Sequence, residues 1–551
     1  MKKRVMSILL IATMVFGLVA CGAKEKGDKD VKTEASTEKA TGEKELKIQL
    51  GASPETLDPA LNVVITGGNI LLQSFECLLV VDKNGELQPG QAEKWEVSDD
   101  GLTWTFYLRD GLKWSDGSEL TAKDFEYSWK RMCNPEVAAP YGQTVLGMVK
   151  GFDEATAGNV DALGVTAKDD KTLVVELNQI CTYFGSLASF ISLCPVQKET
   201  IEKNGDKWAT EAETLVSNGP YYFTEIVPDS HITMSKNPNY WNADAVKLDK
   251  LTFALLDDPN TAFAAYEAGE IEMVKSIPTE EVGNLQERDD FYREPLIGTY
   301  FVNLNVSRAP FDNEKVRQAL SLAVDRKYVA NTLFEGTYTP ASSMIGPGWK
   351  DADGKDFKEN ANGGKPYIDV EDHKGNLEKA KALLAEAGYP NGEGFPEIGY
   401  ATTASGYNKV LAEYLQQAWA ELGINLRLDI IESPSLMAAV DEGNYDTSRN
   451  GWVGDYPDPS NMLEIFYSTN GNNQGRYVNS NYDAAIAVAR ATTDLNKRSE
   501  ALHNAEDILM NEAACIPVAY FNDFWLQTDK VKDVWHSACG FWHFENADIA
   551  E

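Results

Sequence analysis

The 551-residue chain has a formal net charge of −35, from 85 Asp and Glu against 50 Lys and Arg, and 43% of its residues are hydrophobic. A chain of this length exceeds one simple core, so we expect two or three subdomains. The excess of negative charge repels phosphate-rich partners and argues against nucleic-acid binding. The hydrophobic content is ordinary for a soluble globular protein, and no apolar run beyond the N-terminus is long enough to span a bilayer.

The first twenty residues have the pattern of a secretion signal. Three basic residues at positions 2–4 precede an apolar run at 5–20, which is shorter than the ~20 residues of a membrane-spanning helix. The run ends with Leu-Val-Ala-Cys-Gly at 18–22, which is similar to the bacterial lipobox, in which the cysteine is diacylated and becomes the new N-terminus. We therefore predict a signal peptide at 1–20 and an extracytoplasmic protein that is anchored to the cell membrane by lipid on Cys21.

Residues 21–44 are predicted to form the lipidated cysteine and a flexible tether. The segment 24–44 mixes Lys, Glu, Asp, Thr, Ser and Gly without an aromatic residue, so it buries too little apolar surface to fold. As a flexible coil, its ends would lie about 25 Å apart. A folded domain on such a tether can move just above a membrane.

The cysteines do not define a metal site or a disulfide pattern. Apart from Cys21, the chain contains Cys77, Cys133, Cys181, Cys194, Cys515 and Cys539. Outside the cytoplasm these six could form disulfides, but six cysteines allow about fifteen pairings and the sequence selects none of them. No Cys-x-x-Cys pair is present, and we expect most of the six to be free buried thiols.

The remainder of the chain mixes strand-like and helix-like segments. Strand-like segments, mostly with alternating apolar and polar residues, lie at 44–50, 103–108, 173–177, 300–305 and 424–431. Apolar residues at helical spacing predict helices at 69–81, 121–130, 312–324, 377–387 and 408–422. Thr121 with Asp124 resembles a capping box, and Asp312 is the expected N-cap of the third helix. This order, without internal repeats, predicts a multi-lobed α/β protein.

The stretch Arg449–Pro459 carries the strongest signal for a binding site. Its two glycines, two prolines and Asp-Tyr pair are incompatible with the interior of a regular helix or strand, so we predict a bend. Asp455 on this bend is framed by Trp452 and Tyr456. A carboxylate among aromatic rings suits the capture of a cationic amine in a shielded pocket. A surface turn with a satisfied aspartate is the alternative interpretation.

Several motifs, in order along the chain, match one protein family. These motifs are Thr56–Pro59, Phe75–Leu79, Trp95–Gly101, Leu108–Gly117, Ser217–Tyr221, Asn303–Arg326 and Gly451–Pro459. From about Leu46 to Phe544 the chain resembles family 5 of the extracytoplasmic solute-binding proteins, in its peptide-binding branch, the oligopeptide-binding proteins of ABC importers. The expected partners are therefore short peptides and the permease and ATPase of such an importer.

The resemblance implies an α/β, two-lobed, periplasmic-binding-protein-like fold (type II, cluster C) with an extra subdomain on the first lobe. The two lobes are expected to close on the ligand by a hinge, in a protein that acts as a monomer. The implied divisions are 45–80, 206–300 and 521–551 for the first lobe, 81–205 for the extra subdomain, and 301–520 for the second lobe.

The resemblance also implies that Asp455 binds the free α-ammonium group of a peptide. In the family, this role belongs to the aspartate of a Gly-Trp-x-x-Asp-Tyr motif, whose position Asp455 occupies. Gly451, Trp452 and Val453 match positions where main chain and an aromatic ring line the ligand. Main-chain hydrogen bonds like those of an added strand would supply affinity without reading the peptide's sequence.

Four further positions carry over from the family. Arg449 and Arg308 match positions where a basic residue takes the C-terminal carboxylate of a peptide, a task that suits the planar fork of arginine. Tyr141 matches a ligand-facing tyrosine on the extra subdomain, and Asn218 falls in a motif near the hinge. A structural or solvated side chain is the alternative for each of them.

Two departures from the family pattern leave the ligand's length and side chains open. Some relatives have a tryptophan beside the glutamate that matches Glu432, where this chain has Ser433. Relatives can also have a cysteine at the position of Val453, where this chain cannot form a disulfide. The side-chain pockets of this protein are therefore expected to differ in shape.

Three other functions are alternatives to peptide transport: binding of another ligand, enzymatic activity and peptide sensing. Related proteins bind nickel complexes, haem or sugars, but the one local histidine pair, His536 and His543, has no standard metal spacing and is expected to be packed. No cofactor is therefore expected. An enzyme is not expected either, because no hydrolase, metalloprotease or P-loop signature is present. A receptor that senses peptides without importing them would share every residue named above.

Overall fold

The computed structural model of the chain describes residues 42–404 and 406–550. The predicted signal peptide, the lipid anchor on Cys21 and the tether up to residue 41 lie outside these residues. From Glu43 onward the described chain forms one compact unit. None of the helices in this described part has both the length and the apolarity that a membrane crossing needs.

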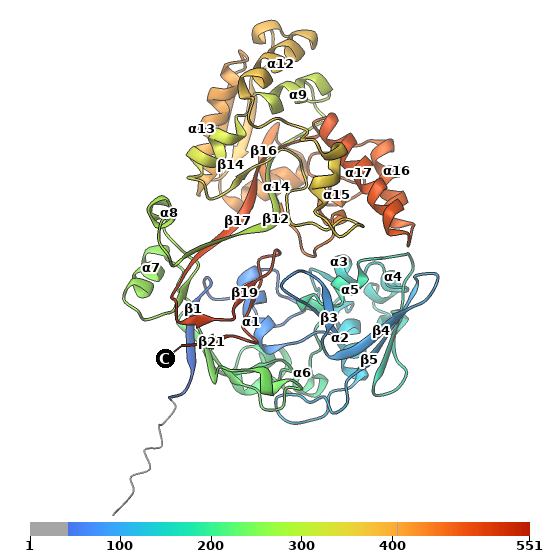
Figure 1. The fold of residues 1–551 in the computed structure, drawn as a ribbon. Coiled ribbons are helices and arrows are strands. Elements are labelled where there is room, and N and C mark those ends of the chain that lie inside the picture. The colour runs from blue at the N-terminus through green and yellow to red at the C-terminus, as the bar shows by residue number, and fades with distance from the viewer. Residues whose placement is uncertain (1–41, 405, 551) are drawn as a thin grey trace, which may run out of the picture. The chain divides into compact units, whose positions relative to one another are not determined.

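One mixed sheet of eleven strands runs through both lobes of this unit (Figure 1). Its order is β15 (Leu426–Ile430), β14 (Ile398–Thr402), β16 (Thr447–Val453), β12 (Phe291–Leu304), β17 (Cys515–Gln527), β11 (Met273–Val274), β1 (Glu45–Gln49), β10 (Lys250–Ala254), β9 (His231–Lys236) and β8 (Tyr221–Val227), with β13 (Thr339–Pro340) paired to β17. The strands β15 to β16 belong to the second lobe, and β11 to β8 belong to the first.

The two longest strands, β12 and β17, cross from one lobe to the other. They pair antiparallel along both halves, with an irregularity between Pro295 and Thr299. Leu526 of β17 lies in a cluster with α7 (Pro259–Glu267) and α8 (Thr279–Leu285), whereas Ile516 lies in the core of the second lobe. The divisions at 300/301 and 520/521 fall inside these crossing strands, and the domain boundaries stay a prediction.

The first lobe also contains a second sheet and several helices, formed by the residues between β1 and β8. A sheet of four strands has the order β4 (Ala92–Val97), β5 (Thr103–Leu108), β7 (Thr172–Glu176) and β6 (Val165–Ala167), and β2 (Leu79–Val81) pairs with β3 (Leu87–Pro89). The helices of this region are α1 (Ile65–Ser74), α2 (Ala122–Met132), α3 (Gly142–Leu146), α4 (Phe152–Thr156), α5 (Phe184–Leu187) and α6 (Lys198–Asn204). The predicted capping box of Thr121 and Asp124 is confirmed at the start of α2.

The C-terminal segment returns to the first lobe in two short hairpin-like pairs. These are β18 (Val531–Lys532) with β21 (Asp548–Ile549), and β19 (Trp535–His536) with β20 (Trp542–His543). Trp542 is fully buried, and the side chains of Asn69 and Gln73 on α1 bond the main chain around it. This anchoring holds the segment against the helix that faces the second lobe in Figure 1.

The second lobe places helices around β14, β15 and β16. They are α9 (Glu314–Leu322), α10 (Arg326–Tyr328), α11 (Phe357–Asn360), α12 (His373–Glu386), α13 (Tyr407–Ala420), α14 (Ser433–Glu442), α15 (Ser460–Glu464), α16 (Ser480–Arg490) and α17 (Leu495–Asn511). The predicted apolar stripe of α9 is buried at Val316, Ala319 and Leu320. Its N-cap, however, is Asn313 and not Asp312, because the Asn313 side chain accepts the N–H of Lys315 at 3.0 Å.

The helix predicted at 69–81 is wrong in its second half. Helix α1 ends at Ser74, and Leu79–Val81 form strand β2. The helix cannot continue because the Asn218 side chain takes both main-chain groups of Glu76: its Oδ1 accepts the N–H at 3.1 Å and its Nδ2 donates to the carbonyl at 2.8 Å. A distant side chain thus satisfies the groups that a further helical turn would have satisfied.

Cys77 and Cys194 form a disulfide, which joins the segment after α1 to the segment before α6. Cys133, Cys181 and Cys515 are free and buried, and Cys539 is free and half-buried. The expectation that most of the six cysteines are free thiols is therefore confirmed, and the structure supplies the one pairing that the sequence could not select.

Candidate ligand-binding site

Strand β16 lies inside the sheet but leaves part of one edge without a strand partner. β12 pairs with β16 along its whole length, from Leu304↔Thr447 to Gly298↔Val453. In the described residues, β14 pairs with β16 only at Thr447 and Ser448. The stretch from residue 449 to 453 therefore presents a strand edge that an extended ligand can join.

The main chain of Gly451 and Val453 is directed toward this open edge. The N–H of Gly454 donates to Ile297 on the β12 side at 2.8 Å, whereas the N–H of Gly451 donates to the side chain of Asn450 at 2.8 Å. Because main-chain groups alternate between the two edges of a strand, Gly451 and Val453 turn theirs away from β12. This placement fits the role that the sequence predicts for both residues.

The predicted bend at Arg449–Pro459 is wrong in its first half, which is the end of β16. A glycine is tolerated inside this strand because the ring of Phe521 packs against it. A Cβ on Gly451 would lie 2.8 Å from Cζ of Phe521. Glycine in a strand interior marks such close approaches, so Gly451 reflects packing beneath the ligand edge and not a turn.

Asp455 lies just beyond the end of β16 and is half-buried. Its carboxylate accepts a hydrogen bond from the Tyr141 hydroxyl at 3.2 Å. No Lys, Arg or His in the described part of the chain forms an ion pair with it, and burial raises the pKa of Asp455 above its usual range. A buried carboxylate without a cation is an unstable arrangement that a cationic ligand would relieve.

Asn461 on α15 fixes both Asp455 and Trp452. Its Oδ1 accepts the indole N–H of Trp452 at 2.7 Å and the main-chain N–H of Asp455 at 3.3 Å. One buried side chain therefore holds the aromatic ring and the carboxylate in a constant relation. Sequence reasoning missed Asn461, and its spacing of six residues from Asp455 carries no signal of its own.

Asp458, the second acid of the bend, is fully engaged within the protein. Its two carboxylate oxygens accept hydrogen bonds from the guanidinium of Arg498 at 2.8 and 2.9 Å. One of them also accepts the N–H of Ser460 at 2.9 Å, at the start of α15. This bidentate pairing leaves Asp458 as a structural residue.

The two arginines predicted to contact a carboxylate lie at different places. Arg449 is on β16; its Nε donates to Asn408 at 3.5 Å, and its guanidinium lies 5.9 Å from the centre of the Tyr300 ring. Arg308 lies beyond the far end of the strand, where it contacts Asp446 at 3.9 Å and the carbonyl of Tyr445 at 3.3 Å. The strand from 447 to 453 separates it from Asp455 by about 20 Å at ~3.3 Å per residue.

Of the two predicted residues on the first lobe, Tyr141 reaches the site and Asn218 does not. The Tyr141 ring packs on Phe190 with 5.2 Å between ring centres, while its hydroxyl contacts Asp455. Burial and the adjacent Asp455 raise the pKa of Tyr141, so it stays a hydrogen-bond donor. Asn218 is buried and both ends of its amide are bonded to the main chain of Glu76.

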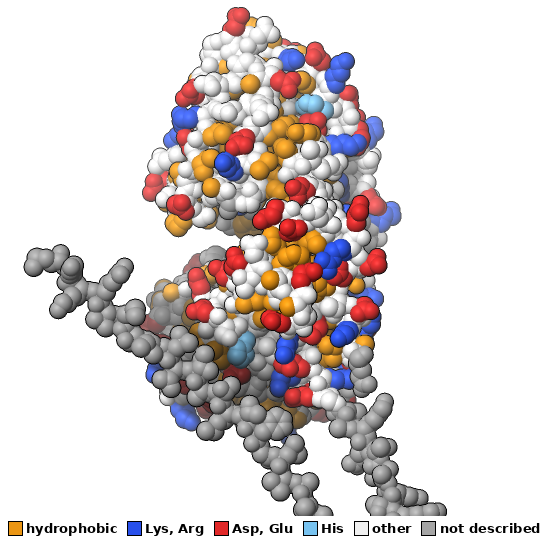
Figure 2. Space-filling model, turned by 90° about the vertical axis from the view of Figure 1, so that its left-hand side faces the viewer, with side chains coloured by type: hydrophobic (Ala, Val, Ile, Leu, Met, Phe, Trp, Pro, Cys, Tyr) orange, Lys and Arg blue, Asp and Glu red, His pale blue; other side chains and the backbone are white. Residues whose placement is uncertain are grey.

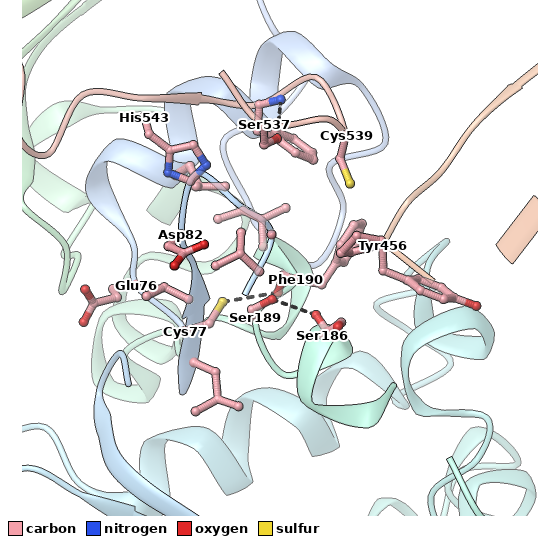
Figure 3. Close-up of a pocket in the computed structure, with 18 of the residues that line it drawn as sticks. Glu76, Cys77, Asp82, Ser186, Ser189, Phe190, Tyr456, Ser537, Cys539 and His543 are labelled. Atoms are coloured by element: carbon pink, nitrogen blue, oxygen red, sulfur yellow. Dashed lines mark hydrogen bonds between the residues drawn. The ribbon is translucent and has the colours of Figure 1, made fainter. Parts of the chain in front are cut away.

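A pocket of about 470 Å³ opens beside Asp455, between the lobes. Its lining comes from residues within 72–89, 186–194, 240–242, 348–350, 455–457 and 537–545, together with Pro220. Figure 3 shows Tyr456, Phe190 and Cys539 around one end of the pocket. In Figure 2 the same unit is hollowed on its left side, between the second lobe above and the first lobe below. Pockets of this size are typical of small-molecule sites.

Sequence reasoning also missed the exposed apolar residues Val63, Val64 and Ile65. They are 40–48% exposed, at the start of α1, and Ile65 lies against Gly540 of the segment that lines the pocket. The sequence does contain a signal for them, namely three consecutive branched apolar residues.

The predicted packing of His536 and His543 is found. His536 is buried with Nε2 3.0 Å from Asp523, and His543 stacks on Trp535 at 3.6 Å. Burial and the neighbouring His536 lower the pKa of His543 to about 3, so it is neutral. Among the described residues, no cluster of His, Cys, Asp and Glu has an arrangement suited to a metal ion.

The chain matches the model of the bacterial extracellular solute-binding proteins, family 5, over residues 86–474. The chain belongs to this family. It is 33% identical to the oligopeptide-binding protein OppA of Bacillus subtilis and 34% identical to the dipeptide-binding protein DppE of the same species, with 99% of each chain covered in both comparisons. Its family is thus one of solute-binding proteins, which act outside the cytoplasm.

The crystal structure of Haemophilus influenzae OppA in complex with RPPGFSPFR matches with a TM-score of 0.74 and 30% identity, covering 93% of this chain and 99% of that one. Another two-lobed relative, the murein tripeptide binding protein MppA of Escherichia coli, matches with a TM-score of 0.76. These matches confirm the predicted two-lobed α/β fold.

Proposed function

We propose that this protein captures short peptides outside the cytoplasm and delivers them to the permease and ATPase of an ABC importer. The relatives that support this proposal are named as oligopeptide-binding and dipeptide-binding proteins, and they cover nearly the whole chain. A relative of the same fold is seen in complex with RPPGFSPFR.

The observation that carries the proposal is the half-buried carboxylate of Asp455 beside the open edge of β16. A linear peptide has an α-ammonium group, which would pair with Asp455, and a backbone, which would bond the main chain of Gly451 and Val453. An ammonium in this place stabilises a carboxylate that burial otherwise disfavours. The two contacts recognise features common to all linear peptides, so the capture would be broad.

The arginines would then hold the other end of the ligand. Arg449 lies on β16, whose end precedes Asp455 by two residues, and we assign it the carboxylate of a short peptide. Arg308 would take the carboxylate only of a longer ligand, and it would have to exchange its contacts with Asp446 and Tyr445 for that purpose. Trp452 would form an aromatic wall whose position is fixed by Asn461.

We also propose that the protein is a lipoprotein anchored through Cys21. The support is the lipobox-like pattern at 18–22 after an apolar run. Two acyl chains give stable attachment where one is marginal, so the folded unit would sample peptides close to the membrane that holds its permease. Mass spectrometry of the mature N-terminus tests this point directly.

Mass spectrometry of the ligands retained by the purified protein tests the proposed function. After denaturation, wild-type protein is expected to release linear peptides with free α-amines, and Asp455→Asn protein is expected to release far fewer. Release of a metal complex, haem or a sugar in stoichiometric amount, without peptides, would contradict peptide binding.

A further inference from the structure

The pocket beside Asp455 extends from the carboxylate into the first lobe. Phe190 connects the carboxylate with the part of the pocket in the first lobe, because its ring packs on Tyr141, whose hydroxyl contacts Asp455. Figure 3 shows Tyr456, which follows Asp455 in the chain, at one side of the pocket and Glu76 and His543 at the other. The pocket thus begins where the proposed peptide amine would be bound.

The walls of this pocket are mostly apolar and are held in place covalently. Leu72, Phe75, Leu79, Val80 and Ile191 contribute to the lining. Cys77 and Cys194 also line it, and their disulfide joins two adjacent chain segments of the wall, with 4.3 Å between their Cα atoms. A wall that is preformed in this way loses little conformational freedom when a side chain enters.

Two acidic side chains, Glu76 and Glu545, lie in the wall of the pocket. Glu76 is buried, and its carboxyl group accepts hydrogen bonds from Tyr240, from Trp241 at 2.7 Å and from Gln91 at 2.6 Å. Burial raises the pKa of Glu76 to about 6 and raises that of Glu545 as well. His543, which lines the pocket, is uncharged.

The two lysines that line the pocket, Lys83 and Lys350, lie at its rim. Lys350 forms an ion pair with Glu86, and its side chain is 43% exposed. Lys83 is exposed on the turn between β2 and β3. Neither lysine therefore neutralises the carboxyl groups in the depth of the pocket, which keeps its acidic and apolar character.

A peptide held at Asp455 would send one side chain into this pocket. Its backbone leaves the α-carbon along β16, toward Gly451 and Arg449. The α-carbon also carries the side chain of the first residue, and Asp455 lines the pocket whereas none of residues 449–453 does. The side chain of the first residue is therefore the part of the ligand that would contact the pocket lining.

We propose that this pocket makes the protein selective for peptides whose N-terminal residue has a large apolar side chain, and selective against Asp or Glu at that position. The proposal rests on the proposed function, since it requires the amine to be bound by Asp455. Burying a phenylalanine or leucine side chain instead of an alanine one is expected to raise affinity about 10-fold or more. A carboxylate would face Glu76 and Glu545, and Arg109 already lies over Trp241 and acts on Glu76, so affinity is expected to fall by a similar factor or more.

Titration calorimetry with peptides that differ only in the first residue tests this selectivity. Two series, X-Ala-Ala and X-Ala-Ala-Ala-Ala with X as Phe, Leu, Ala, Lys or Glu, cover short and longer ligands. We expect Phe and Leu to bind about 10-fold or more tightly than Ala, and Glu to bind most weakly. Equal affinity for all five would overturn the pocket's role while leaving peptide binding intact, whereas binding of none of them would count against the proposed function itself.

Two substitutions localise the effect to the pocket. Phe190→Ala removes part of its wall, and Ser189→Trp fills space beside Phe190 from a half-buried position. Both are expected to reduce the ratio of Phe-Ala-Ala to Ala-Ala-Ala affinity toward one. The ratio is the readout, so a general loss of affinity through Tyr141 does not imitate the result. An unchanged ratio in a folded Ser189→Trp variant would contradict the assignment.

Phe395→Ala is a matched control for the loss of a partly buried aromatic ring. Phe395 is in the second lobe, where it packs on Tyr389 with 5.0 Å between ring centres. This variant is expected to lose a similar amount of stability and to keep the wild-type affinity ratio. A change of the ratio in Phe395→Ala as large as that in Phe190→Ala would show that the effect is not local.

Discussion

The two halves of the bend after β16 hold two aspartates with opposite environments. Asp458 is satisfied by the chain itself, through two hydrogen bonds to Arg498 and one to Ser460. Asp455, three residues earlier, contacts a neutral tyrosine hydroxyl and has no basic partner among the described residues. The same residue type in the same bend is therefore paired within the protein at one position, whereas at the other we propose that it captures the ligand.

Burial without a cation does not by itself identify a binding residue. Glu506 is completely buried on α17, and burial raises its pKa to about 8. Its carboxyl group accepts the N–H of Ile345 at 2.7 Å inside the second lobe. Asp455 differs because it lines a pocket and lies at the end of an open strand edge. Access to ligand, together with an unpaired charge, makes the distinction.

The largest expected effect is the loss of stability in Asp458→Asn. Removing one partner of a buried ion pair leaves Arg498, whose side chain is 9% exposed, without its counter-charge. We expect the free energy of unfolding, measured by denaturant titration, to fall by about 3–5 kcal/mol. Peptide affinity, measured under conditions where the variant is folded, is expected to stay within a few-fold of wild type.

An exposed pair provides the control for that prediction. Asp429 forms a bidentate pair with Arg427 at 2.8 Å, but the two side chains are 36% and 52% exposed. Asp429→Asn is expected to change stability by less than about 1 kcal/mol. Equal losses of stability in Asp458→Asn and Asp429→Asn would contradict the structural role of Asp458. A loss of peptide binding in folded Asp458→Asn would contradict the distinction between Asp458 and Asp455.

A second effect is the dependence of peptide affinity on pH. Burial raises the pKa of Asp455 in the unliganded protein, and an ammonium ligand favours the ionised carboxylate. Protonation therefore competes with the peptide, and affinity is expected to fall up to tenfold per pH unit once the pH drops below this raised pKa. Calorimetry between pH 7 and pH 4 in wild type and Asp455→Asn measures it. A fall of the same steepness in Asp455→Asn would assign the dependence to another group.

The smallest expected effect is that of Tyr141→Phe. The hydroxyl donates to Asp455 at 3.2 Å and helps to orient the carboxylate. Its removal is expected to weaken binding by about 1 kcal/mol, or about fivefold. Tyr328→Phe, at a tyrosine that is 44% exposed on α10, is the control and is expected to have no effect. A larger loss in Tyr141→Phe than in Asp455→Asn would move the main anchor to the tyrosine.

Local patterns predicted much of the fold and point to Asp455 as the proposed anchor, but long-range contacts decided the rest. The alternation at 103–108 and the capping box at Thr121 are written in adjacent residues, and both are found. The end of α1 depends on Asn218, which is 142 residues away from Glu76. The role of Asp458 depends likewise on Arg498, 40 residues further along the chain.

The open edge of β16 could not be predicted for the same reason. It exists because β14 pairs with only two residues of β16, and the register of two strands that are distant in sequence is not encoded in either one alone. The glycine at 451 is a turn signal in the sequence, whereas in the structure it accommodates the ring of Phe521. The pocket beside Asp455 combines seven separate segments of the described chain, which only the folded chain brings together.

The most direct test of the central claim is a double-mutant cycle between Asp455 and the amine of the peptide. Titration calorimetry would compare Phe-Ala-Ala with its N-acetylated form, on wild type and on Asp455→Asn. In wild type, acetylation is expected to cost about 2–5 kcal/mol, or about 30-fold to several-thousand-fold in affinity. In Asp455→Asn the free peptide is expected to bind as weakly, and acetylation to cost little more. Equal costs of acetylation in both proteins would show that Asp455 does not hold the amine.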